Sequence, residues 1–197
     1  MTDTPSSTEQ TVGGRTDAVD FLTSQHREVE ALWAQLEGAG SNVSTDRARA
    51  ARQIVRLLSQ HDAIETQLLY PELRDVGGDE GTQQSDHSLE EHQMIREMLK
   101  EVDRADDLDE ESYSTLARCI AAVNHHVTEE ESVIFPLLRR QCSVERLNEL
   151  GSKMASMMDT VPTHPHPSTP NSKLGATVAG AVTGAMDRMR DAGDDRH

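Results

Sequence analysis

Aromatic residues are scarce in this sequence, and their scarcity bears on the fold class. Tryptophan, tyrosine and phenylalanine together account for 3% of the 197 residues. β-Strands favour aromatic and β-branched side chains, so this composition favours helices over a β-sheet. A chain of this length can bury a hydrophobic core without disulfides or structural zinc. The starting hypothesis is therefore a single helical domain.

Cysteines and long apolar runs are also rare. The two cysteines, Cys119 and Cys142, are too few and too far apart in sequence for a zinc module or a redox pair, and we interpret them as thiols in a reducing cytoplasm. No segment reaches the ~18 consecutive apolar residues that a membrane span requires. Residues 1–14 have neither the basic start nor the apolar run of a secretory signal. We predict a soluble cytoplasmic protein, a monomer or weak homo-oligomer, in which residues 1–15 are disordered.

Basic residues are outnumbered by acidic ones. The chain has 19 Lys and Arg against 35 Asp and Glu, which gives a formal charge of −16. Fourteen of the acidic residues lie between Asp75 and Glu111, where there are three basic residues. Such a charge makes nucleic acid an improbable partner. The acidic stretch is most simply a solvated surface, although it could attract cations towards a binding site.

Apolar residues recur with helical spacing in four long stretches. The expected helices span residues 17–37, 44–74, 86–104 and 111–138, and the polar run 79–85 is expected to be a loop. Long helices joined by short loops pack against antiparallel neighbours. The sequence therefore predicts an all-α fold, an antiparallel up-down four-helix bundle.

The C-terminal part of the chain predicts less structure. A short extra helix over residues 144–158 is expected to complete the bundle domain, which would span residues 16–158. Residues 160–171 contain four of the seven prolines and cannot form a regular helix. The glycines of the following segment favour a weak helix or disorder. Residues 159–197 are therefore predicted to be a proline-rich linker and a flexible, weakly helical tail.

An internal repeat carries the candidate chemistry. His61 is followed by Glu65 and His126 by Glu130, and in both segments a proline lies ten residues after the histidine. Residues four apart lie on the same face of a helix, so each pair places an imidazole beside a carboxylate. One more histidine precedes each pair, His26 by 35 residues and His92 by 34. In a four-helix bundle these residues could gather four imidazoles and two carboxylates.

This combination of side chains suits particular metals. Imidazole with carboxylate suits iron or manganese, whereas an all-oxygen shell suits calcium or magnesium and thiolates suit zinc or copper. Two iron ions fit best. If both glutamates bridge and a hydroxide or oxide bridges as well, about two of the roughly twelve positions around two octahedral ions stay open. An open position on a redox metal is what dioxygen, peroxide or nitric oxide requires.

The spacing also distinguishes between di-iron architectures. A ferritin-like bundle needs Glu-x-x-His twice, and that spacing does not occur in this sequence. A single histidine on a helix is more often a surface or core residue than a ligand, and a metal-free bundle is the plainest alternative. Two matched His-x-x-x-Glu pairs with two equally spaced histidines are hard to explain by packing or charge alone. We therefore predict a metal centre formed by His26, His61, Glu65, His92, His126 and Glu130.

The motif set resembles that of the hemerythrin-like, cation-binding His-His-Glu domain family. The resemblance covers about residues 17–140 and includes Leu-Tyr-Pro71 and Ile-Phe-Pro136, which follow the two pairs. It implies a di-iron four-helix bundle. For the family it implies oxygen carriage, oxygen, redox or iron sensing, nitric oxide or peroxide chemistry, or repair of iron centres. Our main hypothesis is a non-haem di-iron protein that binds or reacts with dioxygen, peroxide or nitric oxide.

Two positions depart from the pattern of the family's oxygen carriers. Those carriers have a histidine pair four residues apart on the third helix, whereas Ser88 and Arg96 flank His92 at that spacing. His87 is the nearest spare histidine, but it lies five residues back, ~140° around the helix. We keep it as a possible fifth or supporting ligand.

The second departure concerns register. His125 could replace His126, and Glu129 or Glu131 could replace Glu130. The ten-residue offset to the proline selects His126 and Glu130, which leaves His125, Glu129 and Glu131 to the solvated surface or to a position that supports a ligand.

An alternative function is a non-catalytic oxygen, redox or iron sensor acting through a partner protein. No signalling or DNA-binding segment is evident in the sequence, so a signal would have to pass to a separate protein. A repair function lacks the short Cys-bearing N-terminal module of that family branch. Trp33, Tyr70 and Phe135 are expected to pack in the core rather than to contact a cofactor.

Overall fold

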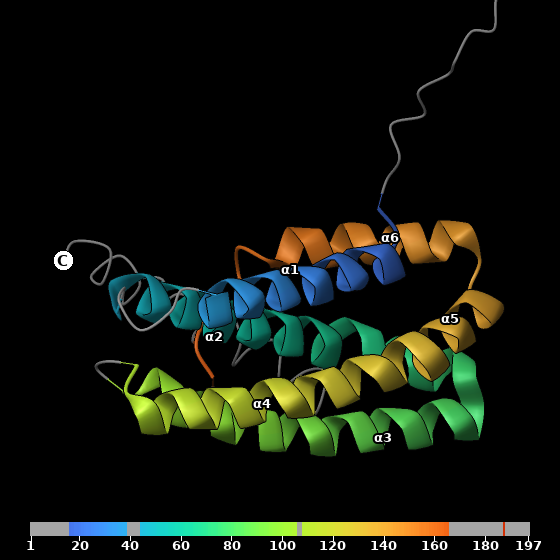
Figure 1. The fold of residues 1–197 in the computed structure, drawn as a ribbon. Coiled ribbons are helices and arrows are strands. Elements are labelled where there is room, and N and C mark those ends of the chain that lie inside the picture. The colour runs from blue at the N-terminus through green and yellow to red at the C-terminus, as the bar shows by residue number, and fades with distance from the viewer. Residues whose placement is uncertain (1–15, 39–43, 106–107, 166–186, 188–197) are drawn as a thin grey trace, which may run out of the picture.

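The computed structural model describes residues 16–38, 44–105, 108–165 and 187 (Figure 1). The helices are α1 (Ala18–Gly38), α2 (Ser44–Ile64), the π-helical η1 (Glu65–Leu69), α3 (Tyr70–Asp103), α4 (Glu110–Glu129), the π-helical η2 (Glu130–Ile134), α5 (Phe135–Gln141) and α6 (Val144–Met157). No strand occurs among the described residues. The predicted all-α class is confirmed.

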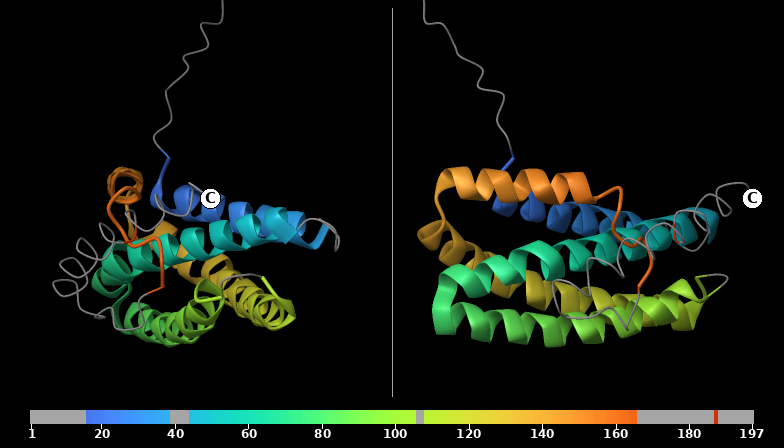
Figure 2. Two further views of the ribbon diagram at one scale, coloured as in Figure 1. Left: turned by 90° about the vertical axis from the view of Figure 1, so that its left-hand side faces the viewer. Right: turned by 180° about the vertical axis from the view of Figure 1, so that it is seen from behind.

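The long helices form an antiparallel up-down bundle. α1 packs against α2, and α3 packs against α4, and the views in Figures 1 and 2 show these two pairs as two layers. The extra helix α6 lies along the outer side of α1. None of the helices in the described part of the chain is long and apolar enough to cross a membrane.

Polar side chains cap several helix starts. Asp109 accepts a hydrogen bond from the Ser112 amide at the start of α4, and Ser143 accepts one from the Arg146 amide at the start of α6. Both are typical N-caps, which satisfy amides that have no partner within the helix. The helix following the acidic turn and the short C-terminal helix therefore begin where the sequence predicted.

The loop predicted over residues 79–85 is wrong. The chain turns sharply at Gly78, which has φ 59° and ψ −137°, and becomes helical again directly after it. Only glycine adopts this backbone conformation readily. The polar side chains after the turn bond back to the helix, since Thr82 donates to the Gly78 carbonyl and Ser85 to the Gly81 carbonyl. The polar composition therefore reflects hydrogen bonds within a helix and not a loop.

Gly81 allows the two halves of this turn to pack closely. A Cβ atom at this position would lie 2.1 Å from the Leu73 carbonyl oxygen. The close approach lets the Ser85 hydroxyl lie 3.3 Å from the Tyr70 carbonyl oxygen. Close packing of the backbone therefore holds the sharp turn at Gly78 in place.

The hydrophobic core consists of two clusters at opposite ends of the bundle. One includes Leu22, Leu69, Leu73, Leu138 and Leu150, and the other includes Ile54, Leu58, Leu99, Leu116 and Ile120. Cys119 is buried in the second cluster and Cys142 is half-buried, and both thiols are free. The polar side chains of the next section lie between these clusters.

Part of the predicted linker and tail lies among the described residues. Residues 159–165 have no helix, but Val161 packs into the first core cluster. The rest of the predicted linker and tail, except Asp187, and the predicted disordered residues 1–15 lie outside the described residues.

Candidate metal centre

The two π-helical turns begin at the two glutamates of the internal repeat. The amide of Tyr70 donates to the Glu65 carbonyl and the amide of Phe135 donates to the Glu130 carbonyl, in each case five residues back. A proline follows immediately in both segments. A proline ring clashes with the carbonyl four residues before it and cannot donate a hydrogen bond, so a widened turn accommodates it. Such π turns are frequent at functional sites.

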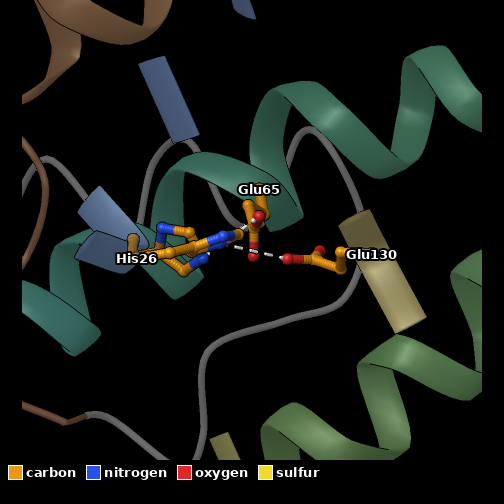
Figure 3. A group of neighbouring side chains, drawn as sticks. His26, Glu65 and Glu130 are labelled. Atoms are coloured by element: carbon orange, nitrogen blue, oxygen red, sulfur yellow. Dashed lines mark ion pairs between the residues drawn. The ribbon is translucent and has the colours of Figure 1, made fainter. Parts of the chain in front are cut away.

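The structure brings together all six predicted side chains at mid-bundle. His26 comes from α1, His61 from α2, His92 from α3 and His126 from α4, and the π-helical turns supply Glu65 and Glu130. All six are buried, and both glutamates are fully inaccessible to solvent. Figure 3 shows His26 and the two glutamates pointing towards one another.

Each carboxylate presents one oxygen to each of two histidine pairs. Glu65 Oε1 lies 3.1 Å from His61 Nε2, and its Oε2 lies 3.4 Å from His92 Nε2. Glu130 Oε2 lies 3.4 Å from His26 Nε2, and its Oε1 lies 3.4 Å from His126 Nε2. The arrangement defines two adjacent positions. His26 and His61 face one of them, His92 and His126 face the other, and both carboxylates lie between.

In each of the four central histidines, the ring nitrogen Nδ1 points away from the centre and lies close to an oxygen atom of a neighbouring helix. The Nδ1 distances are 2.9 Å from His26 to Glu131, 3.0 Å from His61 to Gln25, 2.7 Å from His92 to Asp62 and 2.8 Å from His126 to Glu91. Hydrogen bonds of this kind hold the proton on Nδ1 and leave the Nε2 lone pair free for a metal. All four imidazoles are therefore oriented as metal ligands would be.

Sequence reasoning missed three of these supporting residues, Gln25, Asp62 and Glu91. For Glu131 the sequence predicts only a solvated or supporting position. Each supporting residue is adjacent in sequence to one of the six central residues, but it orients the histidine of another helix. The signal available was a polar residue beside each candidate ligand. Which helix it would face could not be read from the chain.

Arg96 takes a supporting position as well. It occupies the place where the oxygen carriers have a second histidine, and its Nη1 lies 2.9 Å from Asp62 Oδ1. Asp62 is the acceptor for His92. Although burial acts to raise the pKa of Asp62, hydrogen bonds from His92 and Arg96 hold that pKa below its usual value. Asp62 therefore stays ionised and keeps the His92 ring oriented.

Several buried atoms at the centre have no hydrogen-bond partner in the described part of the chain. These atoms are His26 Nε2, Glu65 Oε1 and Glu130 Oε2. The Nε2 atoms of His92 and His126 are also 2.9 Å apart. Burial of unpaired polar groups costs free energy, whereas a cation between the carboxylates and imidazoles would satisfy them. The donor set therefore fits a bound metal.

The pKa values of the central side chains are shifted because these groups are buried close to one another. Burial and the nearby charge of Glu130 raise the pKa of Glu65 to about 8. Burial lowers the pKa of His61 to about 4. Although burial acts to lower the pKa of His126, the charge of Glu130 raises it well above the usual value, so the metal-free centre holds a proton on His126 as a positive charge beside Glu130. A metal ion would supply positive charge in place of that proton.

Tyr70 was expected to be a packing residue, but its hydroxyl lies inside the centre. The oxygen is 3.0 Å from His92 Nε2, 3.3 Å from Glu65 Oε2 and 3.3 Å from Glu130 Oε1. The equivalent residue of the other repeat is Phe135, whose ring stacks on His26 with 5.8 Å between centroids. The two positions therefore differ, with a phenol beside one and an apolar ring beside the other. The difference between Tyr-Pro and Phe-Pro was the signal in the sequence.

The alternative ligands of the sequence analysis lie on the surface. The side chains of His87 and His125 are 50% and 68% exposed, and Glu129 lies beside them. His87 does not reach the inner group, and His126 rather than His125 points inwards.

A small cavity borders the histidines. It has a volume of about 30 Å³. Its wall includes the four central histidines and the apolar residues Val29, Leu58, Ile95, Leu99 and Val123. Glu30, Asn124 and Val127 line both this cavity and a wider, solvent-open groove beside α1 and α4. Among the described residues, the centre therefore borders a small chamber that adjoins a solvent-open groove.

Comparisons with known proteins identify the family of the chain. The model of the hemerythrin HHE cation-binding domain matches residues 17–138. An uncharacterised hemerythrin-like protein of Schizosaccharomyces pombe is 28% identical over 172 residues, which cover 87% of this chain and 84% of that protein.

A crystal structure of an HHE cation-binding domain-containing protein of Mycobacterium kansasii superposes with a TM-score of 0.61. The two sequences are 24% identical, and the match covers 72% of this chain and 85% of the Mycobacterium kansasii chain. That likeness concerns the fold. The His/Glu groups and the matching domain both suggest metal binding. The chain belongs to the hemerythrin HHE cation-binding domain family.

Proposed function

We propose that this protein holds a non-haem di-iron centre that binds or reacts with dioxygen, peroxide or nitric oxide. In this proposal His26, His61, His92 and His126 are terminal ligands, and Glu65 and Glu130 bridge the two ions. The observation that carries it is the division of each carboxylate, with one oxygen towards each histidine pair. A single ion would leave one oxygen of each carboxylate without a partner.

When bound, two irons would supply redox chemistry and open coordination positions for a small ligand. The chain itself orients the ligands and shields the centre from water. The hydrogen-bonded Nδ1 atoms fix all four rings, and the two core clusters limit the access of water. Orientation of this kind typically changes metal affinity or activity by about 10–100-fold.

The size and lining of the cavity limit what could reach the centre. A volume of about 30 Å³ accommodates one or two molecules of the size of water. Although charged side chains contribute to its wall, the accessible surface of the cavity is mainly apolar, which favours uncharged molecules over ions. These properties support a ligand of two to four atoms and argue against a larger organic substrate.

Tyr70 supplies a proton donor next to the pair of His92 and His126. Burial and the charges of Glu65 and Glu130 raise the pKa of its phenol well above the usual value. The phenol therefore stays protonated and can donate a hydrogen bond to an oxygen atom in the centre.

The proposal is tested by metal content and visible absorption. The purified chain is reconstituted with iron(II) under nitrogen and then exposed separately to air, peroxide and nitric oxide. We expect about two irons per chain and near-ultraviolet bands that change with at least one of these molecules. Turnover with one of them would make the protein an enzyme, and reversible change without turnover would make it a carrier or sensor.

A pair of isosteric variants provides the control. Glu65→Gln should lose iron, whereas Glu28→Gln, which changes an exposed glutamate of α1, should retain it. A wild-type chain that folds but binds no iron, or equal iron in both variants, would overturn the proposal.

A further inference from the structure

The outer surface of α3 and α4 carries two more pairs with the His-x-x-x-Glu spacing. His87 and Glu91 lie on α3, and His125 and Glu129 lie on α4. These pairs are distinct from the buried group, and the proposed di-iron function does not use them as ligands. Because α3 packs against α4, the two pairs face the same patch of surface.

The distances in this patch suit a metal ion. His87 Nε2 lies 3.1 Å from Glu129 Oε2 and 3.8 Å from Glu91 Oε1, and one ligand atom from each of the three residues lies within 4.8 Å of the others. Ligands at about 2.0–2.1 Å from a tetrahedral ion are roughly 3.3 Å apart. The three atoms therefore need to move little to surround one ion.

His125 lies at the rim of the same patch. Its Nε2 is 3.8 Å from Glu91 Oε1 and 3.7 Å from Glu129 Oε1. It is the more exposed of the two histidines, with 68% of its side chain accessible. It could supply a fourth ligand after a rotation of its side chain, or water could fill that position.

The charge of the patch also favours a cation. Among the described residues, neither Glu91 nor Glu129 forms an ion pair with a lysine or arginine, and the imidazoles are their ion-pair partners. Glu91 is 7% exposed as a residue and is held in place, since its Oε2 accepts the hydrogen bond from His126 Nδ1 at 2.8 Å. Its other oxygen faces the patch. The patch is therefore partly preorganised by the buried centre.

We propose that His87, Glu91 and Glu129 form a surface site for one divalent transition-metal ion, with His125 at its rim. Imidazole and carboxylate together suit zinc, cobalt or iron(II) better than calcium or magnesium. The ion would be open to solvent, unlike ions in the buried centre. Glu91 would link this ion to the buried centre, because its other oxygen orients His126.

Cobalt(II) titration of the tag-free, full-length chain tests this site. Wild-type protein and His87→Gln/Glu129→Gln are first loaded with iron under nitrogen, and bound cobalt and its visible d–d absorption are then measured. We expect one more cobalt per wild-type chain than per variant chain, or at least about tenfold weaker cobalt binding by the variant. With only two equivalents of iron supplied per chain, the iron content should be equal, because neither substituted residue belongs to the buried group.

Glu90→Gln is the matched control, since it removes an exposed acid of α3 that is not part of the patch. Equal cobalt binding by the wild type and the double variant, or an equal loss in Glu90→Gln, would overturn the proposal. The comparison does not depend on which metal the buried centre prefers. If the chain takes up no iron, the same titration is read as the difference in total cobalt between wild type and variant.

Discussion

The four central histidines are held by a closed ring of supporting residues. Gln25 of α1 orients the histidine of α2, Asp62 of α2 that of α3, Glu91 of α3 that of α4, and Glu131 of η2 that of α1. Each helix therefore positions a proposed ligand on the next. A change in one supporting residue should affect one histidine without removing a ligand.

Asp62→Asn tests whether a supporting residue matters for metal binding, at the position that follows His61 in the sequence. The amide can still accept a hydrogen bond, but it loses the charge that attracts both His92 and Arg96. We expect metal affinity to fall by about 10–100-fold. Competition with a chelator measures the affinity, and Glu28→Gln serves as the control. An unchanged affinity would contradict the supporting role of Asp62.

Tyr70→Phe tests the polar contact at the centre. The variant keeps the packed ring but loses a hydroxyl close to two carboxylates and His92. We expect the free energy of unfolding of the metal-free protein to fall by about 1–2 kcal/mol, because buried acceptors lose their donor. Urea unfolding measures this value. Phe135→Tyr introduces a hydroxyl in the other repeat, and it should not restore the stability of the Tyr70 variant.

At the scale of elements, α6 is fastened to the bundle by a buried carboxylate. The Arg146 guanidinium of α6 forms hydrogen bonds with both oxygens of Glu72 on α3, one of them at 2.7 Å. The hydrogen bonds from Arg146 lower the pKa of Glu72. The native state therefore binds fewer protons at this group than the unfolded state does. The stability that it contributes is complete above the unfolded pKa of about 4.3 and is lost as the pH falls through the lower folded pKa.

Arg146→Met makes this contribution measurable. We expect a lower free energy of unfolding than wild type at pH 7, by about 1–3 kcal/mol, since Glu72 is left buried without its partner. The difference should shrink as the pH falls below about 4. Urea unfolding of both metal-free proteins at a series of pH values measures it, and Arg140→Met is the exposed control. A difference that stays constant with pH would show that Glu72 is not responsible.

The helices were predictable from the sequence, whereas the π-helical turns were not. The apolar period of α1 and of the run α4, η2 and α5 depends on residues close in sequence, and both stretches begin and end near the predicted positions. The helical turn after Gly78 was missed because a polar run is as compatible with a helix as with a loop. The π turns at Glu65 and Glu130 depend on how each proline is accommodated, and apolar periodicity carries no information about that.

At the scale of the whole molecule, the bundle places two repeated hairpins around one centre. The spacing of the repeat was enough to predict the six central residues, because matched positions on antiparallel helices meet at the same level. It could not predict the supporting ring or the inward hydroxyl of Tyr70, which depend on how neighbouring helices are rotated. We expect the two core clusters on either side to hold the helices together without help from the centre.

Metal removal should therefore lower stability and leave the helices intact. Unfolded chain has no preformed site, so bound metal stabilises the native state. At free metal of about 100 times the dissociation constant, that stabilisation is about 2.7 kcal/mol. We expect a chelator to lower the thermal midpoint while the far-ultraviolet circular dichroism at 25 °C stays unchanged. Loss of helix on chelation would mean that the metal is needed for folding itself.

Iron-edge anomalous diffraction from crystals of the anaerobically reconstituted protein would locate the metal ions themselves. For a di-iron centre we expect two iron peaks about 3.5–4 Å apart. One should lie beside His26 and His61 and the other beside His92 and His126, with Glu65 and Glu130 between them. A single peak, or iron bound only outside this group, would contradict the proposed di-iron centre.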